Sequence, residues 1–311
     1  MKKCLILGVV TVTTVSIAIA AVEPEFSADR IRAHVAFLAD DTLAGREAGT
    51  RGHEIAARYV ASQFALLGVK PGGQNGQYFQ KVDLFESART GPVPTVALTT
   101  PRGTQTLKHR GAVLVRGPIA GGAVNLSAPL VFVGYGIKDS GLGYDDYKGR
   151  DVQGKIAVVL LGSPKGMDGE VGAHLLSEQS RVAAGQGAVG IISLQTRVTA
   201  AAFPWRQLIE LQEDFATTWI RGDGTPFDPS YGLKAAALIE PAAAASLFEG
   251  APMSLAHVLA EADRPGGRPQ GFPLKTTARL TVATKVRRFS SPGPAIASTT
   301  VRWITPQALQ L

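Results

Sequence analysis

Residues 128–194 contain two short apolar runs that are rich in β-branched side chains and are bounded by glycine. The runs lie at residues 130–133 and 156–161. Runs of this length and composition are typical of strands that are buried on both faces. Residues 177–185 have the character of a short helix, and Ile191 and Ile192 begin a third apolar run. This stretch therefore predicts a sheet of buried strands with a helix between two of them.

Three glycines in the same stretch, Gly185, Gly187 and Gly190, spell the GxGxxG pattern of dinucleotide-binding sites. Such a site needs a strand, then the glycines, then a helix whose N-terminus faces the phosphates. Here the predicted order is helix, glycines and strand. We therefore interpret the glycines as a helix C-cap and a point of close helix–sheet packing, and not as a cofactor site.

Composition limits the kinds of partner that the chain can take. Of the 311 residues, 45% are apolar and 18% are charged, which indicates a globular protein and not a disordered one. The formal net charge is +7, but lysine and arginine are scattered, and the densest cluster is only Lys285, Arg287 and Arg288. No aromatic-interleaved basic stripe is present. We therefore expect a solvated basic surface and no nucleic-acid partner.

The N-terminus has the features of a secretory signal peptide over residues 1–21. Lys2 and Lys3 precede an apolar run that ends in the small-x-small site Ala18-Ile19-Ala20. We expect a secreted or periplasmic protein without stable membrane insertion after cleavage, and a retained signal anchor is the alternative. Cleavage would also remove Cys4, the single cysteine. Disulfides and cysteine-based zinc sites are then excluded from the mature chain.

After the signal, the sequence predicts two amphipathic helices joined by a polar, glycine-containing loop. Ser27 is suited to the N-cap of the first helix, and apolar residues from Ile31 to Leu38 form its face. The second helix is expected over residues 52–67, ended by Gly68. Strands are expected at residues 78–84, 96–98, 112–115, 233–239 and 276–287. Further helices are expected at residues 241–248, with a proline at the first position, and at 254–261, while residues 203–212 fit either a helix or a loop.

Residues 125–285 resemble the protease-associated domain, a β-rich module that is inserted into certain exopeptidases and receptors. The residues that carry the resemblance are VGYGI at 133–137, YDDYKGRDVQGKIAVVLLG at 144–162, and AAGQGAVGIISL at 183–194. Each piece alone is common, whereas the three in this order over sixty residues are specific.

Residues 38–82 are similar to the start of the secreted di-zinc aminopeptidases, a family that includes relatives of leucyl aminopeptidase and of glutamate carboxypeptidase. The matching positions are Asp41, Leu43, Gly45 and Arg46, then Gly49-Thr50-x-Gly52, Gly68-Val69-x-Pro71 and Tyr78-Phe79-Gln80. The resemblance implies an α/β fold. It consists of an N-terminal fragment of a zinc-exopeptidase domain at residues 22–122, followed by a β-rich α+β protease-associated domain at residues 123–287. Residues 288–311 form a tail that does not continue the family pattern.

The resemblance also implies a function, the removal of N-terminal residues from peptides by a zinc metallopeptidase. The family binds two zinc ions through histidines and carboxylates, uses a separate glutamate as general base, and has its first ligand motif, His-x-Asp, after the insert. None of the five histidines here is followed two positions later by Asp, and no His, Asp or Glu follows Asp263.

We therefore expect zinc to be the cofactor of the full-length family but none to bind this chain, and we assign no catalytic, cofactor or metal residue. An inactive, truncated copy is expected, arising from a frameshift near residues 290–292 or from a shortened product. Resequencing that finds no family-like sequence in any downstream frame would contradict this. The alternative is a non-catalytic module in which the protease-associated domain binds a peptide or protein partner.

The sequence offers several residues that could form a different catalytic or metal site. His53 and Glu54 begin a HExxH-like run, but position 57 is Ala, so we interpret both as polar residues of an amphipathic helix. Ser163 follows Gly162 without the G-x-S-x-G elbow of a serine hydrolase. The other candidates are His34, beside a helix face, and His109 and His174, which are expected in polar loops without partners at ligand spacing.

Four aspartates, Asp139, Asp145, Asp146 and Asp151, gather in the turn-rich segment after VGYGI. They could bind a cation weakly. Aspartate side chains also accept hydrogen bonds from backbone amides two residues further on, and we predict turns of this kind here.

The N-terminal helices carry apolar faces that the catalytic sheet covers in the family. Leaving several large side chains exposed forfeits a few kcal/mol at about 25 cal/mol per Å2, which is comparable with the net stability of a domain. We predict that this segment is mobile or prone to aggregation. Limited proteolysis checks this, and equal resistance of both parts of the chain would count against it.

Overall fold

The computed structural model describes residues 27–296, so the predicted signal peptide and the end of the predicted tail lie outside the described residues. The chain divides into two compact units, Met1–Ala56 and Ala57–Leu311, and each is described by itself. Within residues 27–296, no helix is both long and apolar enough to cross a membrane.

The first unit contains α1 (Ala28–Leu38) and the short helix η1 (Asp41–Leu43), and it ends within α2 (Arg51–Leu66). The expected N-cap is confirmed, because Ser27 Oγ accepts a hydrogen bond from the Arg30 amide at 3.3 Å. Ile31 and Val35 on α1 are 54% and 56% exposed, so the apolar face of this helix is largely uncovered. The proteolysis prediction remains to be tested.

The loop between η1 and α2 explains why residue 52 in the motif Gly49-Thr50-x-Gly52 is a glycine. A Cβ atom on Gly52 would lie 1.9 Å from the carbonyl oxygen of Leu43 and 2.1 Å from that of Gly45. Any side chain at Gly52 would therefore collide with the backbone of the loop. The side chain of Thr50 caps α2 by accepting from the His53 amide at 3.2 Å.

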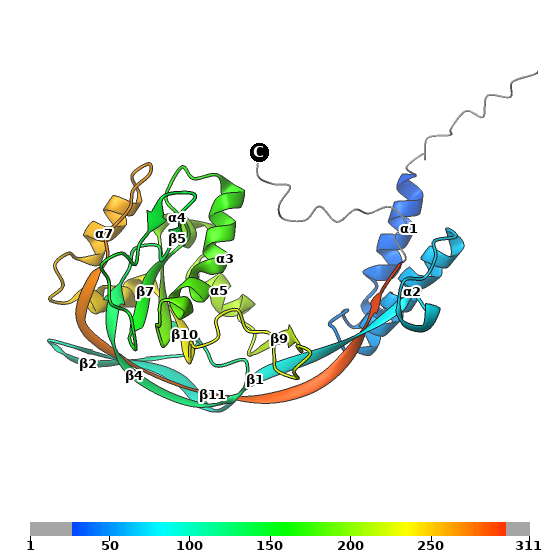
Figure 1. Ribbon diagram of the computed structural model, residues 1–311, viewed down its shortest axis with the longest axis horizontal. Helices are drawn as coiled ribbons and strands as arrows, with labels where there is room; N and C mark the ends of the chain where they lie inside the picture. The colour runs from blue at the N-terminus through cyan, green and yellow to red at the C-terminus, as the bar shows by residue number, and fades with distance from the viewer. Residues whose placement is uncertain (1–26, 297–311) are drawn as a thin grey trace, which may run out of the picture. The chain divides into compact units, whose positions relative to one another are not determined.

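The second unit is dominated by a nine-stranded mixed sheet (Figure 1). Its strands are β1 (Phe79–Thr100), β2 (Gly103–Lys108), β3 (Val113–Arg116), β4 (Gly122–Phe132), β7 (Ile156–Leu161), β8 (Gly190–Gln195), β9 (Phe215–Trp219), β10 (Ala235–Ile239) and β11 (Phe272–Pro294). The order is β2-β1-β11-β4-β7-β8-β10-β3, and β9 pairs with β1. The strands β4, β7, β8 and β10 are mutually parallel, whereas the remaining pairs are antiparallel.

The strands at the two ends of this order, β2 and β3, are consecutive in the chain. A β-bridge between His109 and Val113 joins the end of β2 to the start of β3, so the sheet is nearly closed. The helices of this unit are α3 (Gly169–Gly185), α4 (Arg197–Ala202), α5 (Trp205–Leu211), α6 (Pro241–Ala244) and α7 (Leu255–Ala262), with short helices at η2 (Gln74–Gly76) and η3 (Ala245–Phe248). The small pair β5 (Lys138–Asp139) and β6 (Tyr144–Asp145) forms a separate hairpin.

The strands β7 and β8, together with the last residues of β4, are buried on both faces, as their sequences predict. Val158, Leu160 and Ile192 belong to one hydrophobic cluster, whereas their neighbours Val159 and Ile191 belong to another. Side chains alternate between the two faces of a strand, so a strand that is covered on both sides is apolar at every position. The structure therefore confirms the α/β class, and it shows that the sheet is mixed and nearly closed.

The GxGxxG glycines terminate a helix, as interpreted. The Ala188 amide donates to Ala183 O at 3.1 Å and the Gly187 amide to Ala184 O at 2.9 Å, which is a Schellman motif. Gly187 has a φ of +85°, and Gly190 opens β8. The order helix, glycines and strand is confirmed.

Several element predictions were wrong in length. The strands expected at residues 78–84 and 96–98 are one strand, β1, because pairing with β11 continues on both sides of a register shift between Thr90 and Thr95. β2 was not predicted, since its sequence GTQTLK contains a single large apolar residue. α3 begins at Gly169 and not at residue 177, because Asp168 caps it by accepting from the amides of Glu170 and Val171.

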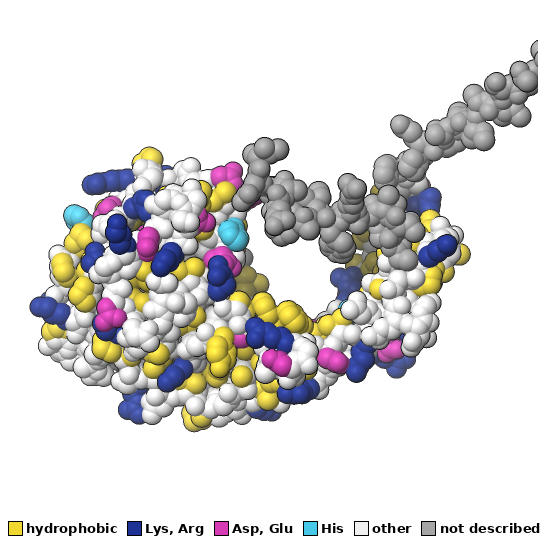
Figure 2. Space-filling view, in the orientation of Figure 1, with side chains coloured by type: hydrophobic (Ala, Val, Ile, Leu, Met, Phe, Trp, Pro, Cys, Tyr) yellow, Lys and Arg dark blue, Asp and Glu magenta, His cyan; other side chains and the backbone are white. Residues whose placement is uncertain are grey.

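The strand expected at residues 276–287 is also longer than predicted. β11 continues to Pro294, which pairs with Phe79, so the first residues of the predicted tail belong to the sheet. Backbone pairing with β1 holds this part in place, although its Ser-, Pro- and Gly-rich sequence lacks an alternating pattern. On the face seen in Figure 2, lysine and arginine side chains are dispersed, with acidic side chains among them.

Candidate functional site

The candidate histidines lie on different elements of the chain. His53 lies in the first turn of α2, and its Nδ1 is 3.3 Å from the carbonyl oxygen of Arg46 in the preceding loop, while Glu54 is exposed on the same helix. His34 is half-buried on α1. His174 was expected in a loop and lies exposed on α3, because that helix begins earlier than predicted.

Three of the four aspartates after VGYGI form local turns as predicted, whereas Asp146 accepts from the Ile137 amide at 3.0 Å, nine residues earlier in the chain. Asp145 accepts from the Tyr147 amide at 3.1 Å, and Asp151 accepts from the Gln153 amide at 3.1 Å. Asp139 accepts from the Leu142 amide at 2.9 Å. Across residues 27–296, no group of three or more His, Cys, Asp or Glu side chains is placed to hold a metal ion. Ser163 follows β7, half-buried, and its side chain packs against Gly172 of α3.

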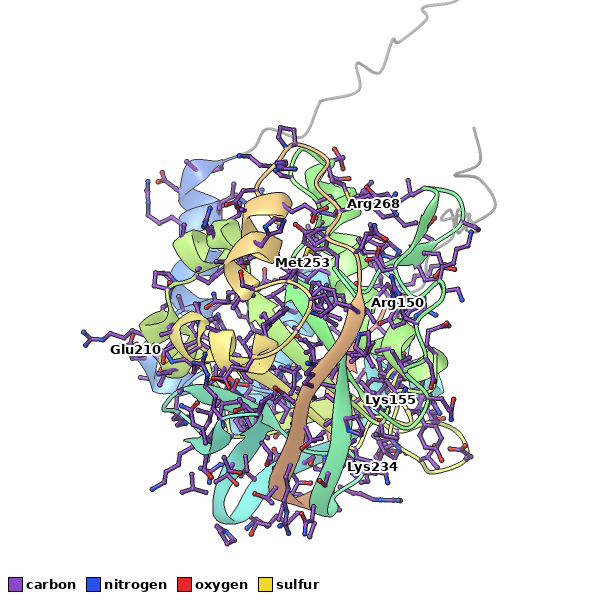
Figure 3. All side chains as sticks on the ribbon, turned by 90° about the vertical axis from the view of Figure 1, so that its left-hand side faces the viewer. Arg150, Lys155, Glu210, Lys234, Met253 and Arg268 are labelled. Carbon is purple, nitrogen blue, oxygen red and sulfur yellow. The ribbon has the colours of Figure 1, made fainter. Side chains whose placement is uncertain are left out.

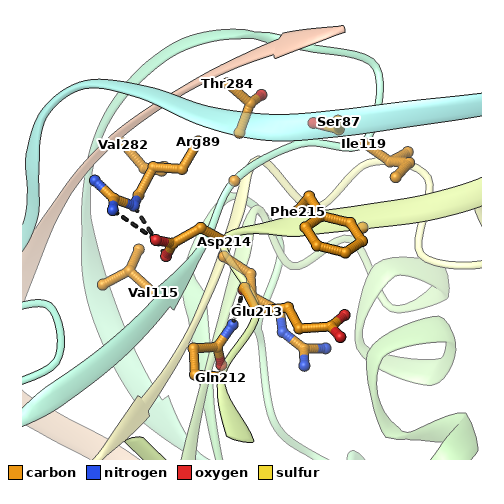
Figure 4. A pocket seen from close by; sticks show the side chains of 13 residues that line it. Ser87, Arg89, Val115, Ile119, Gln212, Glu213, Asp214, Phe215, Val282 and Thr284 are labelled. Atoms are coloured by element: carbon orange, nitrogen blue, oxygen red, sulfur yellow. Dashed lines mark hydrogen bonds and ion pairs between the residues drawn. The ribbon is translucent and has the colours of Figure 1, made fainter. Parts of the chain in front are cut away.

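The densest group of ionic contacts is centred on Asp214, which precedes β9 (Figure 4). Arg89 on β1 binds its carboxylate in a bidentate manner, with Nε 3.1 Å from Oδ1 and Nη2 2.7 Å from Oδ2. The Arg89 amide also donates to the Asp214 carbonyl at 2.7 Å. These hydrogen bonds from Arg89 lower the pKa of Asp214 to about 2. The carboxylate is therefore charged at all ordinary pH values.

His109 belongs to the same group, through a partner that is remote in the sequence. It lies between β2 and β3, is 7% exposed, and its Nε2 is 3.4 Å from Asp214 Oδ1. Its Nδ1 accepts a hydrogen bond from the Val115 amide at 3.0 Å. The proton therefore resides on Nε2, and burial lowers the pKa of the ring despite the neighbouring carboxylate.

Both ring nitrogens of His109 are thus engaged, so the His109–Asp214 pair has no free nitrogen with which to act as a general base. The pair also does not fit a zinc ion, because it offers one histidine and one carboxylate that is already bound by Arg89. Arg110 donates to Gln212 O at 2.5 Å and lies 3.6 Å from Asp214. We assign the group a structural role, which is to fasten the segment between α5 and β9 to β1 and to the β2–β3 turn.

Sequence reasoning could not find this group. His109 and Asp214 are 105 residues apart, and neither stands in a recognisable motif. Only the pairing of β9 with β1 brings them together.

Two pockets that share Arg116 and Gln212 lie beside the Asp214 group. One, of about 100 Å3, is lined by Arg89, Asp214, Thr284 and their neighbours. The other, of about 240 Å3, is lined by apolar residues that include Ile191 and Leu238 and by the polar residues Ser180, Ser193 and Gln212. We call the two together the Arg116 groove.

Arg116 is the cation of this groove that the fold leaves available. Its side chain is exposed at the end of β3 and forms no ion pair within residues 27–296. Ser180 on α3 and Ser193 on β8 line the same groove. The groove thus combines apolar lining residues, two hydroxyl groups and a free guanidinium, which is the usual make-up of a binding site.

No protein-family model matches the sequence, and no curated protein matches it. Among solved structures, the chain is similar to an aminopeptidase from Aneurinibacillus sp. strain AM-1, with a TM-score of 0.41, 20% identity, and coverage of 86% of this chain and 46% of that one. It is similar to a zinc aminopeptidase from Bacillus subtilis, with a TM-score of 0.31, 15% identity, and coverage of 87% and 46%.

A third similar structure is a psychrophilic subtilisin-like protease from an Antarctic Pseudoalteromonas, with a TM-score of 0.29, 10% identity, and coverage of 68% and 38%. The likeness to each structure is distant and partial. This chain spans less than half the length of each of the three.

Proposed function

We propose that this chain is a secreted or periplasmic protein of the zinc-aminopeptidase type, and that residues 79–294 bind a peptide or protein segment. The observation that carries the proposal is the Arg116 groove. It places a guanidinium without an ion pair in the described residues beside apolar lining residues, whereas the neighbouring Arg89 and His109 are already engaged. The peptide class of the ligand comes from the sequence resemblance.

Peptide binding suits this groove for two reasons. Apolar side chains of a ligand could cover Ile191 and Leu238, and a ligand carbonyl or carboxylate could accept hydrogen bonds from Arg116. In addition, Arg89, Asp214 and His109 hold one wall in place, so little conformational freedom is lost on binding.

The test is titration of the full chain with a panel of short synthetic peptides, followed by NMR or calorimetry. Arg116→Gln removes the cation, and Ser180→Phe places a ring at the rim of the groove. Each should weaken binding by about tenfold. Lys275→Gln, on β11 outside the groove, is the matched control. Unchanged binding by both groove variants would overturn the assignment of this site.

Zinc-dependent removal of N-terminal residues is the second candidate function. Its support is the sequence resemblance, which the loop motif around Gly45 and Gly52 carries in part, although no group of three or more His, Cys, Asp or Glu side chains in residues 27–296 is placed to hold a metal ion. Metal analysis of the purified full chain separates the two functions. About two bound metal ions per chain would support a hydrolase, whereas the absence of bound metal would favour the peptide-binding function.

A further inference from the structure

A second groove lies on the segment YDDYKG, which is part of the sequence motif at residues 144–162. We call it the Arg268 groove, and the lining residues that matter are Lys138, Tyr144, Asp145, Asp146, Lys148 and Arg268. Its volume is about 690 Å3. It shares no lining residue with the Arg116 groove.

The walls of this groove are fixed by close backbone packing. The β5–β6 hairpin pairs Lys138 with Asp145, which supplies one wall. The opposite wall lies against Gly134, where a Cβ atom would be 2.6 Å from the carbonyl oxygen of Pro269. Gly134 has a φ of +64°, so both its conformation and its contact call for glycine. The groove therefore exists before any ligand arrives.

Arg268 is held flat in this groove. Its guanidinium carbon lies 3.6 Å from the centre of the Tyr144 ring. Its two terminal nitrogens reach only the Gly143 carbonyl, each at 3.5 Å, which is the outer limit of a hydrogen bond. It forms no ion pair with any residue between 27 and 296. The stack thus fixes the plane of the guanidinium while its in-plane N–H groups stay available.

The acidic side chains of the groove are turned to the backbone. Asp146 accepts from the Ile137 amide at 3.0 Å, and Asp145 accepts from the Tyr147 amide at 3.1 Å. Lys138 donates to Gln186 at 3.1 Å, whereas Lys148 is exposed and has no ion pair in the described part of the chain. The groups that remain for a ligand are therefore the cationic donors of Arg268 and Lys148.

We propose that the Arg268 groove binds a carboxylate group of a peptide, with Arg268 as the bidentate donor and Lys148 as the second cation. A planar guanidinium matches the two oxygens of a carboxylate, and a fixed plane reduces the entropy that is lost on binding. That the carboxylate belongs to a peptide rests on the proposed function. The groove itself does not depend on Arg116.

The experiment uses the full chain and three synthetic probes, followed by NMR chemical shifts. The probes are N-acetyl-trialanine as free acid, the same peptide as C-terminal amide, and N-acetyl-Ala-Glu-Ala-amide. We expect at least one acid to bind about tenfold or more tightly than the neutral amide. The free acid and the glutamate peptide then show whether a C-terminal or a side-chain carboxylate is preferred.

Arg268→Gln should abolish the preference for the acids, and Arg268→Lys, which keeps the charge but not the fork, should retain part of it. Lys234→Gln is the matched control, because in Figure 3 Lys234 lies at the other end of this face from Arg268. Equal binding of acid and amide, or an undiminished preference in Arg268→Gln, would overturn the inference. If the Arg116 variants lose peptide binding while the acid preference is absent, only this inference fails. If no peptide of any kind binds, the proposed function fails as well.

Discussion

Asp214 and Asp146 each lie near an arginine, yet their pKa values move in opposite directions. Hydrogen bonds from Arg89 lower the pKa of Asp214 to about 2. Burial raises the pKa of Asp146 to about 6, and the charge of Arg268 and the Ile137 amide only partly offset this effect. The difference is one of contact. Arg89 binds its carboxylate directly, whereas Arg268 stacks on Tyr144 and forms no ion pair within residues 27–296.

The two regions therefore use arginine in different ways. The Arg89 guanidinium has a structural role, because its hydrogen bonds to Asp214 join β1 to the segment before β9. The Arg268 guanidinium is positioned by Tyr144 but keeps N–H donors for a ligand. Because it does not bind Asp146 directly, the buried Asp146 carboxylate is costly to ionise. An arginine that stabilises the fold and an arginine that is available to a ligand can thus be told apart by what their N–H groups contact.

The largest expected effect is the loss of stability on replacing Asp214. Asp214→Ala leaves the half-buried Arg89 and the buried N–H of His109 without their acceptor, and we expect the free energy of unfolding to fall by about 2 kcal/mol. Urea denaturation at pH 7 measures it. Asp223→Ala is the matched control, because Asp223 is an exposed turn carboxylate that accepts hydrogen bonds from the amide and the hydroxyl of Thr225. A loss no larger than that of the control would remove the structural role that we assign to Asp214.

The next effect is the pH dependence that Asp146 contributes. Its pKa in the folded state, about 6, lies above the ordinary 3.8. The folded state therefore takes up a proton first, and this group adds stability as the pH falls from about 7 to 4. Asp146→Asn lacks this gain. The unfolding free energy of wild type should therefore increase relative to that of the variant by about 2 kcal/mol when the pH is lowered from 7 to 4.

Comparison of the two proteins isolates the contribution of Asp146. Burial lowers the pKa of His109, so this ring removes stability as the pH falls below its ordinary range near 6.5, but it does so in both proteins. Asp214 loses its contribution only as the pH falls from about 4 towards its pKa of about 2, again in both. A difference that stays constant from pH 7 to 4 would show that burial does not perturb Asp146.

Local sequence patterns predicted those parts of the fold whose causes are local. The apolar runs gave β7 and β8, Ser27 capped α1 as expected, and the glycines after α3 ended that helix. The elements that were missed have non-local causes. β1 continues beyond a register shift at Thr90 only because β11 pairs with it on both sides, and β2 has almost no apolar residue to reveal it.

The candidate sites were less predictable than the fold. His109 has no partner at ligand spacing in the sequence, and its contact with Asp214 joins residues that are remote in the chain. Arg116 had no motif to distinguish it from other surface cations. The Arg268 groove is an intermediate case. Its glycine and aspartate turns were visible in the sequence, but the stack of Arg268 on Tyr144 joins residues that are far apart in the chain.

A smaller effect compares the two arginines directly by replacement with lysine. Arg89→Lys loses the bidentate contact with Asp214 and should lower the free energy of unfolding by about 1 kcal/mol. Arg268→Lys loses a stack near the surface and should lower it by about 0.5 kcal/mol or less. Chemical denaturation of both variants beside wild type provides the measurement. Equal losses would contradict the distinction between a structural and an available arginine.

The smallest effect concerns the ring that holds Arg268. Tyr144→Phe keeps an aromatic face, so its stability and its binding of peptide carboxylates should match those of wild type. Tyr144→Leu removes the stack, which is worth about 0.5–1 kcal/mol near a surface, and should weaken carboxylate binding by about threefold, because the guanidinium must then be ordered by the ligand. The unfolding free energy should change less than it does in Arg89→Lys. If Tyr144→Leu binds the acid probes as tightly as wild type does, the ring does not help to orient Arg268 for a ligand. Arg89 and Arg268 would then differ only in the charge of their neighbours.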